Sequence, residues 1–309
     1  MKILSERQFQ LSRMFVMTQA RLLDKQLAAF YFWGGSSYDV RNALKGFQNT
    51  DGGFGQRIEP DFRLEESSPM GTSIALQYSQ EIGLPVTDPM IQDAVRYLLD
   101  AYDAEEQRWH AVPASINLVP HAPWWSFDET TRRCGVEGTW ANPSAEILGY
   151  LWSYNELAPR QFLHLLSDKA VSELEQMPEK LDLHDFLCYQ RLYRYAPEPY
   201  RSVIKDKLMK SVTFTVDVSP EQWANYGAKP LQIIDSPASP FADMLSNAIQ
   251  LNLEYEIEHI NEDGSWSPNW SWYGNYDEDW LDAEREWKGY LTVRNLKSLY
   301  DFGRIQQIS

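Results

Sequence analysis

The hydrophobic residues of this chain recur at intervals of three and four positions over most of its length. In residues 5–32, for example, Leu11, Phe15, Leu22 and Leu27 fall near the spacing of one helical face. Glycines and prolines mark the ends of several such stretches. The pattern predicts helices over 5–32, 38–48, 72–82, 88–102, 143–155, 159–175, 181–195, 200–211, 241–260 and 283–302.

Alternation typical of β-strands is scarce. Only the string VTFTVDV at 212–218 alternates apolar and polar residues, and it predicts a short extended piece. The longest connections between the predicted helices are irregular and rich in Trp, Pro or acidic residues, and they cover 104–141, 219–240 and 261–280. The predicted fold class is therefore all-α, with long Trp-rich loops gathered at one end.

One order of elements repeats along the chain: a helix, a polar turn with Asp-Gly and an aromatic residue, a loop and a new helix. It is clear at 40–82 and at 245–302, and a blurred version with Trp109 occupies the middle. Helical hairpins that lack a private core must stack on their neighbours. Since no Pro/Gly/Ser-rich linker divides the chain, we expect a single domain over 1–309.

Composition and charge narrow the range of partners. The chain has 309 residues, 43% of them hydrophobic, and a net charge of -16. Such a surface repels nucleic acid and anionic lipid, although it can also simply keep a cytosolic protein soluble. Polar residues interrupt the N-terminus, which predicts neither a signal peptide nor a membrane span. Because Cys134 and Cys188 are the only cysteines and form no disulfide framework, we expect a cytoplasmic protein.

The string QNTDGGF at 48–54 resembles the Q-x-x-D-G-G/S-F/W turn of squalene–hopene cyclases, related terpenoid cyclases and protein prenyltransferase β subunits. EDGSW at 262–266 resembles a second, weaker copy. The resemblance implies an α/α toroid, a barrel of helical hairpins around a central cavity, and activity on an isoprenoid. The motif itself is structural, because its glycines permit a tight turn and its Asp can accept backbone N–H groups.

Two departures from the family pattern affect the chemistry. The D-x-D-D acid of the class II cyclases is absent, and the nearest string is DED at 277–279. A diphosphate substrate would call for Mg²⁺ held by Asp277 and Asp279, or for arginines such as the pair at 132–133. The sequence leaves this requirement open.

The zinc ligands of the prenyltransferases are also absent, since no D-x-C string occurs. His184 and Cys188 lie four residues apart, on one face of a predicted helix. That spacing is compatible with a metal, but it fits a packed core equally well. We therefore predict no zinc there and assign no metal ligands, with the Mg²⁺ requirement left open.

The first candidate site follows the signature turn directly. Glu59 and Asp61 lie two residues apart in a segment that Pro60 keeps extended, so their carboxylates project in similar directions. Arg57 and Arg63 flank them and could fix their ionisation or bind an anion. The alternative is a salt-bridged surface loop.

The second candidate is the aromatic segment 104–141. Tryptophan rings can line an apolar cavity and stabilise a cation, or stack on sugars. They can equally fill the core beneath a long loop. As substrate-binding residues we predict Trp109, Trp124, Trp125 and Trp140.

The third candidate alternates aromatic rings and carboxylates between residues 266 and 282. Trp266 and Trp270 are further predicted substrate-binding residues, and Trp272, Tyr273 and Tyr276 follow them. A carboxylic acid kept neutral by an apolar site could protonate an alkene or epoxide, and Asp277 or Asp279 could fill that role. The alternative is a solvated acidic loop before the last helix.

Two functional hypotheses follow for a small-molecule ligand. The first is a terpenoid-cyclase-like or prenyltransferase-like protein acting on an isoprenoid, in an aromatic cavity lined by Glu59, Asp61, Asp277 or Asp279. The second is a carbohydrate-binding or glycoside-processing barrel, in which two carboxylates flank a glycosidic bond. A toroid that binds a ligand or partner without turnover is the third option. The sequence leaves the substrate, catalysis itself and the oligomeric state open.

Overall fold

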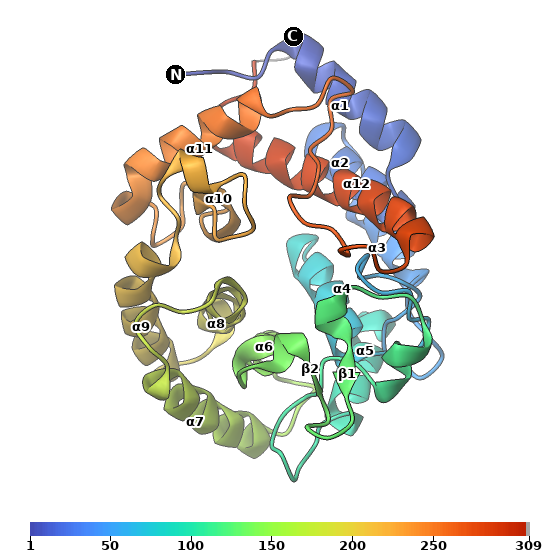
Figure 1. Ribbon diagram of the computed structural model, residues 1–309. Helices are drawn as coiled ribbons and strands as arrows, with labels where there is room; N and C mark the ends of the chain where they lie inside the picture. The colour runs from blue at the N-terminus through green and yellow to red at the C-terminus, as the bar shows by residue number, and fades with distance from the viewer. Residues whose placement is uncertain (307–309) are drawn as a thin grey trace. The chain divides into compact units, whose positions relative to one another are not determined.

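The computed structural model describes residues 1–306 and is mostly helical (Figure 1). The all-α prediction is confirmed, because the only strands among these residues are the short antiparallel pair β1, Phe127–Asp128, and β2, Arg133–Cys134. The helices are α1 Glu6–Gln19, α2 Leu22–Phe32, α3 Ser37–Lys45, α4 Pro69–Glu81, α5 Pro89–Asp100, α6 Ala141–Ser153, α7 Arg160–Gln176, α8 Leu183–Tyr195, α9 Tyr200–Thr215, α10 Pro230–Ile233, α11 Ser246–Glu258 and α12 Asp277–Asp301.

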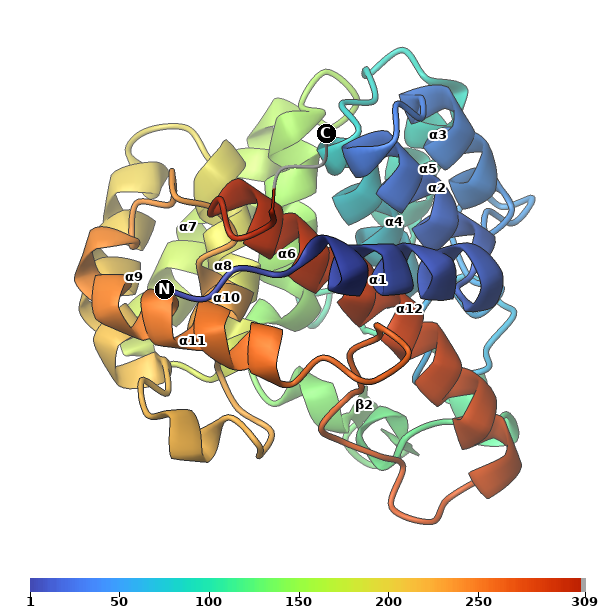
Figure 2. The same ribbon diagram turned by 90° about the horizontal axis from the view of Figure 1, so that it is seen from above.

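The chain forms two compact units, each assembled from separate stretches of sequence. The first unit comprises 1–40, 212–271 and the segment from Asp277 onwards; the second comprises 41–211 and 272–276. In the first unit α1 and α2 pack against α12 (Figure 2). In the second, α6 packs against α4, α7 and α8. The single domain over 1–309 stays a prediction.

Helix α6 is the core of the second unit. Its residues from Ala141 to Trp152 are all buried, which accounts for the nearly continuous apolar run in its sequence. Gly149 lets α8 approach closely, because an added Cβ at this position would lie 2.9 Å from the Cα of Leu192. This contact fixes the two helices that carry a polar network described below.

One helix prediction and the one predicted extended piece were wrong for identifiable reasons. The predicted helix 5–32 is divided, because Ala20 and Arg21 are extended and the Arg21 side chain pairs with Asp24 in the first turn of α2. The extended piece predicted at 212–218 is largely helical, since α9 continues to Thr215. Ile204, Leu208 and Val212 are buried one turn apart along α9. The packing of this helix therefore overrides the strand preference of the residues at 212–215.

The last helix begins earlier than the predicted residue 283. Asp277 and Asp279 lie in the first turn of α12 rather than in a loop before it. Negative side chains stabilise a helix N-terminus, so these acids have a local structural role. Charged residues recur through α12, and within residues 1–306 no helix combines the length and apolar character needed to cross a bilayer.

Candidate functional site

The signature turn at 48–54 satisfies its own backbone groups. The amide of Asn49 donates to the carbonyl of Gly53 at 2.9 Å, and the amide of Gly53 donates to Asp51 Oδ1 at 3.0 Å. The buried Phe54 amide then donates to Thr72 Oγ1 on α4 at 3.0 Å. The turn thus ties the end of one helical hairpin to the start of the next helix, and its residues have a structural role.

The turn at 261–266, in the other unit, repeats this arrangement. Asn261 donates to the carbonyl of Ser265 at 2.9 Å, and the Ser265 amide donates to Asp263 Oδ1 at 3.0 Å. The amide of Trp266 donates to Thr292 Oγ1 on α12 at 3.2 Å. The weaker sequence copy is therefore a close structural copy.

A third version of the turn lies at 103–109. Asp103 and Arg108 exchange backbone hydrogen bonds of 2.9 and 3.2 Å, and the Trp109 amide donates to Ser144 Oγ on α6 at 3.1 Å. The indole N–H of Trp109 donates to the carbonyl of Leu98, as that of Trp266 does to Glu256. The blurred copy in the sequence is therefore a genuine turn of the same kind, with additional charged residues.

Three segments that are distant in sequence meet in the second unit and form what we call the aromatic loop cluster. The segment 61–63 runs beside 120–122, where the Arg63 amide donates to the Pro120 carbonyl and the Ala122 amide to the Asp61 carbonyl, both at 2.8 Å. The third segment is 272–276. The side chains of the cluster are Asp61, Phe62, Arg63, His121, Trp124, Trp125, Trp272, Tyr273 and Tyr276.

At the centre of this cluster a carboxylate, an indole and a guanidinium are held together. Trp272 Nε1 donates to Asp61 Oδ1 at 2.8 Å, and the Arg63 guanidinium carbon lies 5.9 Å from the centre of the Trp272 ring. Asp61, Arg63 and Trp272 are all buried. Nearby, the rings of Phe62 and Trp125 meet edge to face with centroids 5.0 Å apart.

The outer part of the cluster is exposed at its two tyrosines, Tyr273 and Tyr276, while His121 is buried. The Trp124 and Tyr273 rings have centroids 6.5 Å apart, and those of His121 and Tyr276 are 5.8 Å apart. Tyr273 is 71% exposed, and both tyrosines have a positive φ, of 53° and 51°. Such backbone conformations are costly for residues other than glycine and often mark functional sites.

The structure therefore brings together four of the predicted site residues: Asp61, Arg63, Trp124 and Trp125. Glu59 lies next to them, and its Oε1 accepts the Asp61 amide at 3.3 Å. Arg57 does not flank this carboxylate pair as expected, because its guanidinium forms an exposed ion pair with Glu65 at 2.9 Å.

The remaining predicted residues lie elsewhere. Trp109 and Trp140 fill the core of the second unit, and the indole N–H of Trp140 donates to the Gln107 carbonyl. Trp266 is buried in the first unit beside α11. Trp270, in the same unit, packs edge to face against Tyr226 and Trp287. Asp277 and Asp279 belong to the first turn of α12 in that unit.

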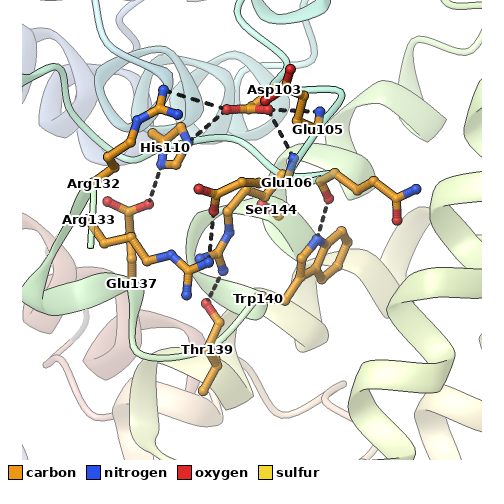
Figure 3. Close-up of polar contacts among 12 residues, drawn as sticks. Asp103, Glu105, Glu106, His110, Arg132, Arg133, Glu137, Thr139, Trp140 and Ser144 are labelled. Atoms are coloured by element: carbon orange, nitrogen blue, oxygen red, sulfur yellow. Dashed lines mark hydrogen bonds and ion pairs between the residues drawn. The ribbon is translucent and has the colours of Figure 1, made fainter. Parts of the chain in front are cut away.

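A charged cluster surrounds the third turn (Figure 3). The His110 ring lies between two carboxylates, with Nε2 3.2 Å from Asp103 Oδ2 and Nδ1 3.3 Å from Glu137 Oε1. Arg133 pairs with Glu106 at 2.8 Å. The carboxylate of Glu137 contributes most to raising the pKa of His110 above its ordinary value, while burial opposes this effect.

A second network, which sequence reasoning missed, joins three helices of the same unit. The buried carboxylate of Glu146 on α6 accepts hydrogen bonds from Gln77 on α4 and Arg191 on α8, both at 2.6 Å, and from Tyr150 at 2.8 Å. Cys188 Sγ also donates to it at 3.7 Å. A single charged residue inside the apolar run of α6 was the signal that could have revealed it.

Comparison with known proteins finds no match: neither a family model nor a curated protein corresponds to this chain.

Proposed function

We propose that this chain is a terpenoid-cyclase-like or prenyltransferase-like protein of the α/α toroid type that acts on an isoprenoid at the aromatic loop cluster. The observation that carries the proposal is the arrangement of Asp61, Trp272 and Arg63. An indole face attracts positive charge, so the Trp272 ring would stabilise the cation that develops along a reacting isoprenoid chain once the Arg63 guanidinium no longer lies over it.

Two further features of the cluster support an isoprenoid ligand. The buried Asp61 carboxylate accepts a hydrogen bond from the Trp272 indole, which holds it in place, and its negative charge would stabilise a neighbouring cation. Trp125 is 5% exposed, and its Nε1 has no hydrogen-bond partner among residues 1–306. Because a buried donor without an acceptor is costly, a ligand oxygen is a natural partner for it.

Carbohydrate binding is the second candidate, and the exposed rings favour it. Trp124 is partly exposed and Tyr273 is largely exposed, and they adjoin each other in the unit that also contains Asp61 and Glu59. Exposed aromatic rings next to carboxylates are suited to stacking on a sugar. This reading places the ligand on the outer part of the cluster, whereas an isoprenoid would contact the Trp272 and Trp125 side.

Incubation of the full chain with farnesyl diphosphate, geranylgeranyl diphosphate and squalene, with and without Mg²⁺, tests the first reading. We expect a new hydrocarbon or prenyl product by gas chromatography with mass spectrometry. Trp272→Phe should reduce product formation at least about tenfold, the effect of losing roughly 1.4 kcal/mol of stabilisation. Trp140→Phe is the matched control, because it also removes a buried indole N–H of the same unit but outside the cluster.

Absence of binding and of product across the isoprenoid panel would reject the proposal. If cellulose-type or chitin-type oligosaccharides then bound, and Tyr273→Ala abolished that binding, the carbohydrate reading would replace it. The denatured chain is the control for non-specific binding. If it bound isoprenoids and oligosaccharides as well as the folded chain does, both proposals would be rejected.

A further inference from the structure

We infer that Asp103, Glu106 and His110 form a binding site for a divalent transition-metal ion of the Zn²⁺ type, with Glu137 orienting the histidine. This inference concerns the third turn, and it does not rest on the function proposed for the aromatic loop cluster. It differs from the sequence-based expectation, which assigned no metal ligands.

The geometry of the three side chains suits a small cation. Two carboxylate oxygens and one imidazole nitrogen lie within 4.8 Å of one another. Each of these side chains is partly exposed, so an ion can reach the site from solvent. Mixed nitrogen and oxygen ligands of this kind suit Zn²⁺, and three protein ligands leave a coordination position for water.

The buried Glu137 is an independent observation that points to a metal. Its side chain is fully buried and its Oε2 accepts hydrogen bonds from the Cys134 amide at 3.0 Å and the Cys134 thiol at 3.2 Å. Its Oε1 has no aligned hydrogen bond within residues 1–306 and lies 3.3 Å from His110 Nδ1. Histidines that bind a metal through one nitrogen usually present the other N–H to a carboxylate, and Glu137 is placed to accept it.

The orientation of the ring completes this pattern (Figure 3). With Nδ1 directed to Glu137, His110 Nε2 points toward Asp103 Oδ2, 3.2 Å away. In this structure the two atoms share a hydrogen bond, so a metal would take the place of the proton between them. A metal ion bound to both atoms would have Glu106 as its third ligand.

Three arginines near this site compete with a metal ion for the carboxylates. Arg133 pairs with Glu106 at 2.8 Å, and Arg132 lies 4.0 Å from Asp103. Both arginines are largely exposed, and ion pairs of this kind are weak, so a metal can displace them. Arg108 is buried and also interacts with Glu106 and Glu137, which lowers the affinity without blocking the ligands.

The direct test is a titration of the untagged full chain with zinc chloride by calorimetry, together with metal analysis after dialysis. We expect one Zn²⁺ per chain. Asp103→Asn and His110→Asn should weaken binding by about a hundredfold, and Glu137→Gln by about tenfold. Glu105→Gln is the matched control, because Glu105 belongs to the same turn and is exposed, and its side chain is not among the three ligands.

Arg133→Ala distinguishes a metal site from a cluster that has only a structural role. It removes the cation that competes for Glu106, so Zn²⁺ should bind several times more tightly than to the unmodified chain. Circular dichroism establishes that each variant is folded. The inference fails if the unmodified chain binds no stoichiometric Zn²⁺, if Asp103→Asn and His110→Asn bind it as tightly as Glu105→Gln, or if Arg133→Ala leaves the affinity unchanged.

Discussion

The turn at 48–54 and the first segment of the aromatic loop cluster, 61–63, lie close together in the sequence, but they are held in place by different kinds of contact. In the turn, backbone groups bond mainly to neighbouring residues, and side chains such as Gln48 and Asn49 bond to the carbonyls of Met90 and Glu65. The cluster, by contrast, depends on segments that start at 61, 120 and 272. The comparison teaches that the recognisable motif organises helices, whereas the side chains suited to ligand binding lie in loops that carry no motif.

The third turn lies between these two cases. It shares with the turn at 48–54 an Asp side chain that accepts the amide two residues further on and an aromatic amide donated to a hydroxyl on the next helix. Yet it also carries Asp103, Glu106 and His110, which converge on one point. Asp103 also has a role in the turn, because its Oδ1 accepts the amides of Glu105 and Glu106, whereas within residues 1–306 the Glu106 and His110 side chains make no such contact with a backbone amide.

The largest effect in this comparison should come from Gly52→Ala. Gly52 has φ +92°, and an added Cβ would lie 2.6 Å from the Asp93 carbonyl oxygen. The strain and the clash together should lower the free energy of unfolding by about 2–5 kcal/mol, measured by urea denaturation. Gly83→Ala is the control, because Gly83 also has a positive φ but nothing lies within 4 Å of its added Cβ. Equal losses for the two variants would contradict this explanation.

Removing the hydroxyl that accepts each aromatic amide should have the next largest effect. Thr72→Val and Ser144→Ala leave the buried amides of Phe54 and Trp109 without an acceptor. Each should cost about 1–3 kcal/mol of unfolding free energy. Ser79→Ala is the comparison. The buried Ser79 hydroxyl donates to the Ala75 carbonyl of its own helix, so its removal leaves no backbone amide without an acceptor. If only one of the two turns responded, their equivalence would be lost.

In the aromatic loop cluster, Trp272→Phe should cost less stability than Gly52→Ala. The ring volume is largely kept, but Asp61 Oδ1 loses the indole N–H. The expected cost is about 1–2 kcal/mol by the same denaturation experiment. A loss as large as that of Gly52→Ala would show that the cluster is part of the fold-forming core rather than a site supported by it.

A pH-dependent effect is expected from the ion pair beside the first turn. Arg41 forms two hydrogen bonds, of 2.8 and 2.9 Å, with Asp88, and this contact is the main reason that the pKa of Asp88 lies below its ordinary 3.8. The pair therefore stabilises the fold above that value and loses its effect as the pH falls through the lowered pKa. Asp88→Asn keeps a cap for α5 but removes the charge, so the stability difference from the unmodified chain should shrink on acidification. A difference that stays constant down to pH 2 would exclude this ion pair as its cause.

The smallest effect on stability should come from Tyr273→Ala. Tyr273 is 71% exposed, so unfolding free energy should change by no more than about 0.5 kcal/mol. The variant is thus a clean probe of carbohydrate binding, measured by calorimetry with oligosaccharides. A large destabilisation would mean that the exposed ring has an unrecognised structural contact.

The sequence predicted helices such as α5 well because their apolar period is set by burial, as for Ile91, Val95 and Leu98. It failed at ends and breaks, such as Ala20–Arg21 and Asp277, where tertiary packing and the helix N-terminus decide. The aromatic loop cluster could be predicted only as separate candidates, because nothing in 57–63 shows that it pairs with 120–122. Glu146 was missed since its partners lie on two other helices.

The most direct test of the aromatic loop cluster as the ligand site is a calorimetric titration with geranylgeranyl diphosphate in the presence of Mg²⁺. The unmodified chain and Trp140→Phe should bind one equivalent with similar affinity, and Trp272→Phe should bind at least about tenfold more weakly. Equal affinities for Trp272→Phe and Trp140→Phe, or no binding by the unmodified chain, would contradict the assignment of this cluster as an isoprenoid site.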